Sequence, residues 1–237
     1  MELKEFYDKG KDLFLPNLSV DMVIIGYEED SLKCLLLRIG DKWLLPGGYI
    51  FRTESVDEAT IRILQERTGL TDPHFKFLSV FGGSNRKFTD EWEHFFKDND
   101  LPWEENGWLN DRFVTLAYYS LVDIDQTKPV LGSVDEAFAW FSMDALPEMW
   151  MDHKEIVQTA KNRLRNDVQQ EHLTYNLLPE EFTMPQLHQL HQTILGEDLD
   201  RSRFQKKMLA SGMFERLPKL KKETPGRNPY RYRIKKS

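Results

Sequence analysis

The stretch from Gly48 to Leu70, GYIFRTESVDEATIRILQERTGL, constrains the fold of this chain more than any other. A glycine turn, Pro46-Gly47-Gly48, precedes a segment in which apolar residues recur at helical spacing. Ser55 is the expected N-cap of this helix, Glu58 would complete a capping box, and Gly69 would end the helix with a positive φ. Carboxylates one turn apart on a helix can share a divalent cation. The stretch therefore has the layout of a site for a metal and a diphosphate.

This stretch resembles the Nudix box, whose pattern is Gly, five residues, Glu, seven residues, Arg-Glu, an aliphatic residue, any residue, Glu-Glu, any residue, Gly and an aliphatic residue. The positions in register are Gly48, Glu54, Arg62, Leu64, Glu66, Gly69 and Leu70. Two positions depart, because Ile63 and Arg67 stand where the family has Glu. The resemblance implies that those positions supply a catalytic base or metal ligand and a metal-binding carboxylate. An aliphatic side chain cannot take a proton and a guanidinium repels Mg²⁺, so we expect a retained helix with no catalytic residue, no metal and no cofactor.

Composition bounds the class of protein. A length of 237 residues suits one or two domains, and 40% apolar with 30% charged residues is typical of a soluble globular chain. The single cysteine, Cys34, excludes an internal disulfide framework and a cysteine-based zinc cluster. The N-terminus lacks the basic and apolar regions of a signal peptide, and no apolar run approaches the roughly 18 residues of a spanning helix. These features predict a cytoplasmic protein without a membrane partner.

The net charge of −7 hides an asymmetry along the chain. Residues 201–237 carry 13 Lys and Arg against two acids, whereas the first 200 residues carry 19 basic and 37 acidic residues. An acidic domain joined to a basic end is typical of a protein that binds nucleic acid through that end. The competing interpretation is a solvated basic tail that binds nothing specific.

The first domain, residues 1–150, is expected to be an α/β fold. Alternating or apolar runs predict strands at Ser19–Tyr27, Leu32–Ile39, Phe75–Phe81, Phe113–Ile124 and Ala137–Phe141. Asp21 is an acid within the first of these strands; it either reaches a ligand cavity or lies near a strand end in water. Mixed strands around one long helix fit the α/β/α sandwich that the Nudix resemblance implies.

An insertion at residues 85–112 interrupts this pattern. It places six large aromatic residues among many acids, namely Phe88, Trp92, Phe95, Phe96, Trp103 and Trp108. A loop of this length is uncommon unless it is functional or packed on itself. The aromatic rings either stack on a sugar, contact a partner or form a small satellite core.

Residues 151–176 are expected to form a connecting helix and linker, and residues 177–237 a separate helical unit. Thr183 with Gln186 predicts a capped helix, and Asp200 predicts the start of a second helix, Arg201–Ser211. Two short helices joined by a tight turn form a helix-turn-helix. Two short strands, at residues 213–217 and 230–234, are expected to flank a wing.

The order of these parts resembles the Nudix-related transcriptional regulators. The matching segments are Phe182–Leu187, Leu199-Asp200-Arg201 with Phe204, Gly226–Pro229 and Tyr232-Arg233-Ile234. The resemblance covers about residues 15–235 apart from the insertion. It implies a Nudix domain that senses a metabolite with lost or reduced hydrolysis, and a winged helix-turn-helix that binds a palindromic operator as a homodimer.

Candidate binding residues follow from this layout. The start of the second helix would enter the major groove of double-stranded DNA, and the wing would contact phosphates or a minor groove. The candidates for DNA binding are Arg201, Ser202, Arg203, Gln205, Lys206 and Lys207 on the helix, with Lys219, Lys221, Lys222, Arg227 and Arg231 on the wing. The candidates for effector binding are Asp21, Arg38, Trp43, Gly48, Glu66, Asn85 and Arg86.

Three functions remain open at this point. The first is a ligand-responsive regulator of pentose or NAD-related metabolism, whose effector is a pentose, a pentose phosphate or ADP-ribose; Trp92, Trp103 and Trp108 slightly favour a pentose because they offer flat faces. The alternative is an active Nudix pyrophosphohydrolase acting on ADP-ribose or a related nucleoside diphosphate derivative. The third is a sensing domain whose basic end binds RNA or a protein. Ile63 and Arg67 favour the regulator over the hydrolase.

Overall fold

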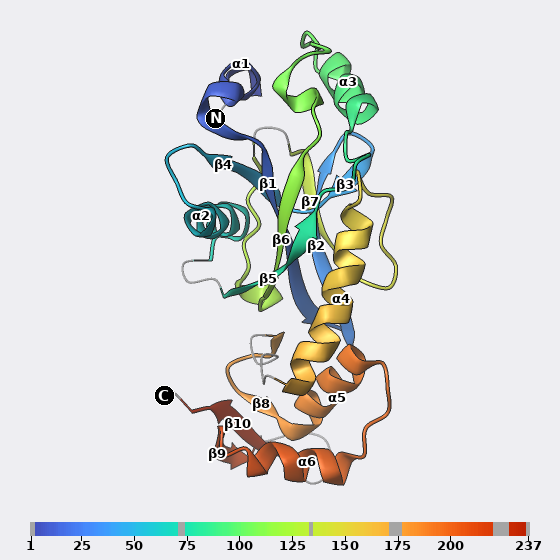
Figure 1. Cartoon of the computed structure of the whole chain (residues 1–237). Helices are drawn as coiled ribbons and strands as arrows, with labels where there is room; N and C mark the ends of the chain where they lie inside the picture. Colours follow the sequence, from blue (N-terminus) through green and yellow to red (C-terminus); the bar gives the residue numbers. More distant parts are fainter. Residues whose placement is uncertain (1–2, 71–73, 133–134, 171–176, 220–227, 236–237) are drawn as a thin grey trace.

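The computed structural model describes residues 3–70, 74–132, 135–170, 177–219 and 228–235. The chain is elongated, with a sheet domain at one end, a winged helix at the other, and one long helix running between them (Figure 1). None of the described helices combines the length and apolarity that a membrane crossing requires.

Strand β1 (Phe14–Glu28) lies at the centre of a seven-stranded mixed sheet. It pairs antiparallel with β2 (Ser31–Ile39) and β4 (Gly47–Phe51) and parallel with β6 (Val114–Leu121). Strand β5 (Phe75–Phe81) pairs with β6, while β3 (Lys42–Leu44) and β7 (Ala137–Ser142) pair with β2. The short 3₁₀ helix η2 (Ile124–Gln126) follows β6.

The two faces of β1 bury two different clusters, as the alternating pattern predicts. Val20, Met22 and Ile24 pack with helix α2 (Val56–Thr68) on one face. Val23 and Ile25 pack with helix α4 (His153–Gln170) on the other. The two helices therefore cover opposite faces of the sheet, which confirms the α/β/α sandwich.

The ends of α2 follow the predicted chemistry. Ser55 caps the helix and forms a capping box with Glu58, and Gly69 ends it at a φ of 69°. The glycine turn before it differs from the prediction, since Gly47 begins β4 and pairs with Asp21 of β1. A Cβ atom at Gly47 would come within 2.7 Å of the Val20 carbonyl oxygen. Glycine therefore allows β4 to lie close against β1.

The insertion forms a satellite core together with the N-terminal helix, which is one of the three alternatives above. Helix α1 (Leu3–Leu13), helix α3 (Thr89–Asp98) and the 3₁₀ helix η1 (Trp108–Asn110) bury Tyr7, Phe96 and Leu109 between them. Trp108 Nε1 donates to the Tyr7 carbonyl oxygen at 3.1 Å. These contacts tie the insertion to the start of the chain, at the end of the molecule farther from the winged helix (Figure 1).

The C-terminal unit contains two helices and a three-stranded sheet. Helix α5 (Met184–Leu195) begins at the Thr183–Gln186 capping box, and Asp200 caps α6 (Arg201–Ala210). The sheet has the order β8–β10–β9, formed by β8 (Phe182–Thr183), β9 (Phe214–Lys219) and β10 (Tyr230–Ile234). The predicted helix-turn-helix and the two strands of the wing are present; β8 is an additional strand too short to show a periodic pattern.

Helix α4 belongs to both ends of the molecule. Its Ile156 and Val157 pack in the same cluster as Val23 of the sheet and Leu187 of α5. Arg165 Nε of α4 donates to the Ile194 carbonyl oxygen of α5 at 3.2 Å. The predicted connecting helix is therefore also the second helical layer of the sandwich.

We expect Leu187→Ala to lower the free energy of unfolding by about 2–5 kcal/mol, because Leu187 is completely buried where α5 meets α4 and its truncation leaves a cavity. The matched control is Leu209→Ala on α6, a side chain that is 43% exposed, with an expected change within about 0.5 kcal/mol. Urea unfolding monitored by circular dichroism measures both variants. Equal destabilisation by the two substitutions would contradict the shared core.

Candidate functional site

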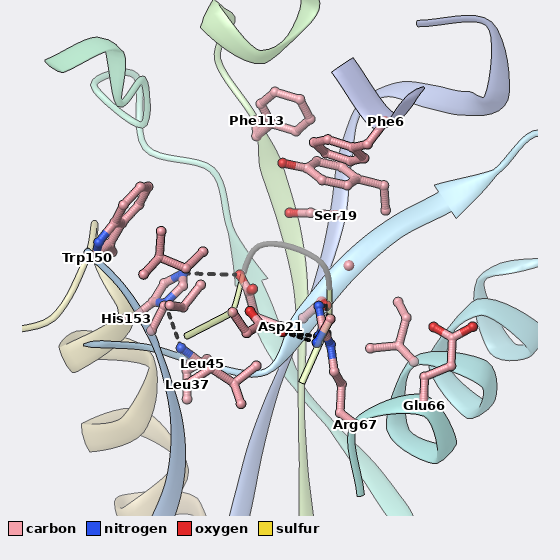
Figure 2. A pocket seen from close by; sticks show the side chains of 18 of the residues that line it. Phe6, Ser19, Asp21, Leu37, Leu45, Glu66, Arg67, Phe113, Trp150 and His153 are labelled. Carbon is pink, nitrogen blue, oxygen red and sulfur yellow. Dashed lines mark hydrogen bonds and ion pairs between the residues drawn. The ribbon is translucent and has the colours of Figure 1, made fainter. Parts of the chain in front are cut away.

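A cavity of about 690 Å³ lies at the end of the sheet where the box helix, β4, the insertion and the start of α4 meet. Figure 2 shows Glu66 and Arg67 entering it from α2, with Phe6 and Phe113 at the other end and Trp150 and His153 beside the start of α4. Its volume lies within the roughly 300–1,000 Å³ typical of small-molecule pockets. The cavity combines an aromatic end with a polar end.

Glu54, the first acid of the box, forms an ion pair with Arg62. Arg62 Nη2 and Nε lie 2.6 and 2.9 Å from the two carboxylate oxygens of Glu54, and Nη2 also donates to the Tyr49 carbonyl oxygen at 2.9 Å. The Phe51 amide donates to Glu54 at 2.8 Å. Hydrogen bonding from Arg62 lowers the pKa of Glu54. Glu54 is therefore ionised and holds the turn between β4 and α2.

Ile63 and Arg67, the two residues that depart from the box, both make contacts that hold them in place. Ile63 is buried beneath Gly48, where an added Cβ would lie 3.1 Å from its side chain. Arg67 Nη1 donates to Asp135, whose side chain is only 1% exposed, while Nε and Nη2 each lie 3.4 Å from the Gly47 carbonyl oxygen. Of the box acids, Glu66 remains largely exposed and contacts Arg62 at 3.2 Å.

A buried ionic network forms the base of the cavity. Arg86 joins Asp21 at 3.2 Å to Asp152 at 3.0 Å and is itself only 4% exposed. His153 Nδ1 accepts from the Leu45 amide at 2.9 Å, so its Nε2 carries the proton in the neutral tautomer and lies 3.8 Å from Asp21. This network fixes the start of α4 against β1 and against Leu45, the residue that follows β3.

The aromatic end mixes residues from distant parts of the chain. Phe6 of α1, Phe113, Trp92 of α3 and Trp150 all line the cavity, and the Trp92 and Trp150 rings lie 5.3 Å apart. Trp103 and Trp108 do not line it. Trp103 packs instead on Phe96, and Trp108 packs on Phe6 of α1. Such an end suits a flat, apolar part of a ligand.

Four of the seven predicted effector residues line the cavity, and three lie elsewhere. Those in the cavity are Asp21, Gly48, Glu66 and Arg86. Arg38 pairs with Glu136 at 3.4 Å, Trp43 packs edge-on against Phe141, and Asn85 is exposed beside Arg86. Arg38 and Trp43 are paired across β2 and β3, and Trp43 packs against the cluster that contains the apolar residues of α4.

Sequence reasoning missed several residues of the cavity. His153 is the first residue of α4, within the segment expected to form the connecting helix and linker, and its place beside Asp152 at a helix start was the available signal. Asp135 carries no such signal, because it meets Arg67 only when the loop before β7 folds back over α2. Phe6 likewise reaches the cavity only through the docking of α1 on the satellite core.

The predicted DNA-binding face of α6 is open. Phe204 and Met208 are buried against α5 and the adjacent sheet, whereas the six candidates Arg201, Ser202, Arg203, Gln205, Lys206 and Lys207 are all exposed. The helix therefore presents a polar, basic surface opposite its buried side, as the spacing predicts.

The five predicted DNA-binding residues of the wing differ in whether the structure describes them and in how exposed they are. Lys219 is exposed at the end of β9, whereas Lys221, Lys222 and Arg227 lie outside the described residues. Arg231 is tied to Glu181 at 2.5 Å and to the Pro218 carbonyl oxygen at 3.3 Å. Arg216, which is not among the predicted residues, is an exposed residue of β9 whose guanidinium lies 3.3 Å from the centre of the Tyr230 ring.

We expect the stability of the protein to fall as pH falls below the ordinary histidine pKa of about 6.5. Burial lowers the pKa of His153 in the folded chain; neighbouring Asp21 and Asp152 oppose this effect and Arg86 adds to it. The unfolded chain therefore binds the proton first, and the dependence is at most about 1.4 kcal/mol per pH unit for one group.

His153→Asn, which retains an acceptor for the Leu45 amide, should flatten this dependence between about pH 7.5 and 5.5. The matched control is His94→Asn, at an exposed position of α3, and it should leave the dependence unchanged. Thermal unfolding across a pH series measures the three slopes. A slope in His153→Asn as steep as that of the wild type contradicts the assignment.

Comparison with known proteins agrees with both halves of this architecture. The family model of the NUDIX domain matches residues 16–160, and that of the NrtR DNA-binding winged helix domain matches residues 174–234. The chain is 25% identical over 209 residues to the ADPR responsive transcriptional repressor NtrR of Acinetobacter baylyi, covering 84% of this chain and 75% of the relative.

Two solved structures share the whole fold. The structure of Shewanella oneidensis NrtR complexed with a 27mer DNA matches with a TM-score of 0.71 at 24% identity, over 92% of this chain and 93% of the other. A MutT/nudix family protein from Enterococcus faecalis matches with a TM-score of 0.67 at 23% identity, over 99% and 94% of the two chains. With a Nudix domain over more than half of its length and an NrtR-type winged helix after it, the chain belongs to the Nudix-related transcriptional regulators.

Proposed function

We propose that this protein is an effector-responsive transcriptional regulator that binds double-stranded DNA through α6 and the wing. The observation that carries the proposal is the exposed face of α6, on which Arg201, Arg203 and Lys206 stand free of the packing that buries Phe204 and Met208. In a helix-turn-helix, the N-terminal residues of the recognition helix contact base edges in the major groove. The basic charge of residues 201–237 supports the same use.

The protein acts as a homodimer on an inverted repeat in this proposal. Two recognition helices would enter major grooves about one helical turn, roughly 34 Å, or a multiple of it apart. The acidic charge of the first 200 residues requires that a dimer keep the basic ends of both protomers on one side. Gel filtration with light scattering, followed by footprinting on an inverted repeat, tests the assembly.

The effector that we propose is ADP-ribose or a closely related nucleoside diphosphate, and the regulated genes belong to NAD-related metabolism. The relative from Acinetobacter baylyi is named for its response to ADPR. A cavity of about 690 Å³ with an aromatic end and a polar end suits a ligand that joins a flat base to a diphosphate. The preference for a pentose rested on three tryptophans, of which Trp103 and Trp108 pack within the satellite core.

Helix α4 provides the physical link that such a regulator needs. Its first residue, His153, lines the cavity, and its Arg165 is hydrogen-bonded to α5 of the helix-turn-helix. A ligand that contacts the start of α4 more favourably in one arrangement of the two ends shifts the population toward that arrangement.

We expect turnover of ADP-ribose with Mg²⁺ or Mn²⁺ to stay near the uncatalysed background. Ile63 offers no base, and Glu54 is held by Arg62. Product analysis by chromatography after extended incubation measures the rate. Robust turnover by the purified wild type that Glu66→Gln abolishes would support the alternative function, a pyrophosphohydrolase.

We expect Arg203→Ala to weaken operator binding by about 1–3 kcal/mol and to change which sequences are preferred, because a side chain at that position of α6 reaches a base edge. Lys219→Ala, the matched loss of charge on the wing, should weaken all sequences alike and lower the salt slope by about one unit. Fluorescence anisotropy on operator and scrambled duplexes across a salt series, with and without ADP-ribose, measures both.

The proposal fails if the wild type binds neither duplex at low salt, with or without ADP-ribose. Binding of a structured RNA in preference to both duplexes would instead support the third function, a sensing domain with an RNA-binding end.

A further inference from the structure

We infer that Arg67 is a built-in cation that occupies the divalent-metal position of the box, so that the cavity binds a diphosphate ligand without metal. The inference rests on the proposed ADP-ribose-type effector for the identity of the ligand. The exclusion of metal from this position rests only on the geometry of α2, β4 and the loop before β7.

The oxygens that a cation would need at this position already accept hydrogen bonds from the guanidinium. Arg67 Nη1 donates to Asp135, and Arg67 Nε and Nη2 both point at the Gly47 carbonyl oxygen from 3.4 Å. Mg²⁺ requires oxygen ligands in near-octahedral order at about 2.0–2.1 Å. A guanidinium in contact with both oxygens excludes such an ion by charge and by volume, so the described residues do not fit the metal that a Nudix hydrolase uses.

The pairing is anchored from both sides. Asp135 also accepts from the Gly132 amide at 2.6 Å, and the Val130 amide donates to the Arg67 carbonyl oxygen at 3.1 Å. The loop before β7 is therefore fixed to α2 at two points on Arg67, its side chain and its carbonyl oxygen, while the Gly132 amide holds Asp135 within the loop. Since the Asp135 side chain is almost completely buried, removing the guanidinium would leave a buried, unpaired carboxylate.

The Arg67 guanidinium has N–H groups left to donate to a ligand, in addition to those that contact Asp135 and Gly47. A guanidinium has five N–H groups in a planar fork, and the side chain of Arg67 is 19% exposed and lines the cavity. Asp135 offsets much of its charge, so recognition of a phosphate depends on directed hydrogen bonds more than on net attraction. Neighbouring Arg62 lines the same part of the cavity and is shared with Glu54 and Glu66.

The first test uses the metal alone. Mn²⁺ titrated into the full-length wild type, monitored by electron paramagnetic resonance, should show no stoichiometric site of submillimolar affinity. Arg67→Glu, which places a third acid beside Glu66 and Asp135, should create one. Arg52→Glu, the same charge change at an exposed position between β4 and α2, should not. A submillimolar Mn²⁺ site in the wild type that Arg67→Gln leaves unaltered overturns the inference.

The second test uses ADP-ribose and calorimetry, with EDTA or with millimolar Mg²⁺. The wild type should bind equally under both conditions, and Arg67→Gln should bind about 10-fold to 100-fold more weakly, as expected for a lost hydrogen bond to a charged group. Arg67→Lys retains a charge for Asp135 but loses the fork, so it should fall between them. Arg52→Gln is the control, and circular dichroism verifies that each variant is folded.

The outcomes separate the inference from the proposed function. Binding by the wild type only when Mg²⁺ is present overturns the inference and leaves the ADP-ribose sensor intact. Wild-type affinity in both Arg67→Gln and Arg67→Lys overturns the role of the guanidinium. No binding of ADP-ribose by the wild type under either condition overturns the proposed effector and the metal-free binding inferred from it, whereas the exclusion of metal is decided by the Mn²⁺ titration.

Discussion

The packing of α4 on two partners is the constraint on which the rest of this structure depends. One apolar stripe, including Ile156, Ala160 and Leu164, is buried in a cluster that contains strands of the sheet and helices of the winged unit. Because protein interiors are close-packed, a displacement at one end of such a helix is transmitted to the other rather than absorbed between them. The Nudix domain and the helix-turn-helix thus share a core instead of being joined by a bare linker.

At the polar end of the cavity, side-chain ion pairs are found where the Nudix box pattern would place metal-binding carboxylates. Arg62 satisfies Glu54, Arg67 satisfies Asp135, and Arg86 satisfies Asp21 together with Asp152. Each pair is partly or fully removed from water, where an unpaired charge is costly and a paired one holds its partner in a fixed direction. The arrangement preserves a shaped binding site while leaving few unoccupied carboxylates for a hydrolytic metal.

The aromatic insertion serves the site indirectly. By packing with α1, it builds a satellite core whose edge supplies Trp92 and positions Phe6 beside the cavity. The N-terminal helix and the insertion, which are far apart in the sequence, therefore act as one element of the binding site. A ligand with a flat group would meet rings that are already held in place by their neighbours.

The sequence by itself determined the parts of this protein that depend on local spacing. The capping boxes at Ser55 and Thr183, the alternation along β1 and the buried side of α6 were all readable, because helix and strand periods and cap chemistry act over a few residues. The identity of Ile63 and Arg67 also indicated a changed box without any structure.

Only the tertiary structure decided which distant groups meet. Asp135 contacts Arg67, and His153 contacts Leu45 and Asp21, at sequence separations of 68 residues or more. Arg38 and Trp43 were expected in the cavity, yet they pair with each other across β2 and β3, where Arg38 contacts Glu136 and Trp43 packs on Phe141. The physical reason is that a cavity is formed by the closure of loops over a core, and no local pattern records which side chains that closure brings together.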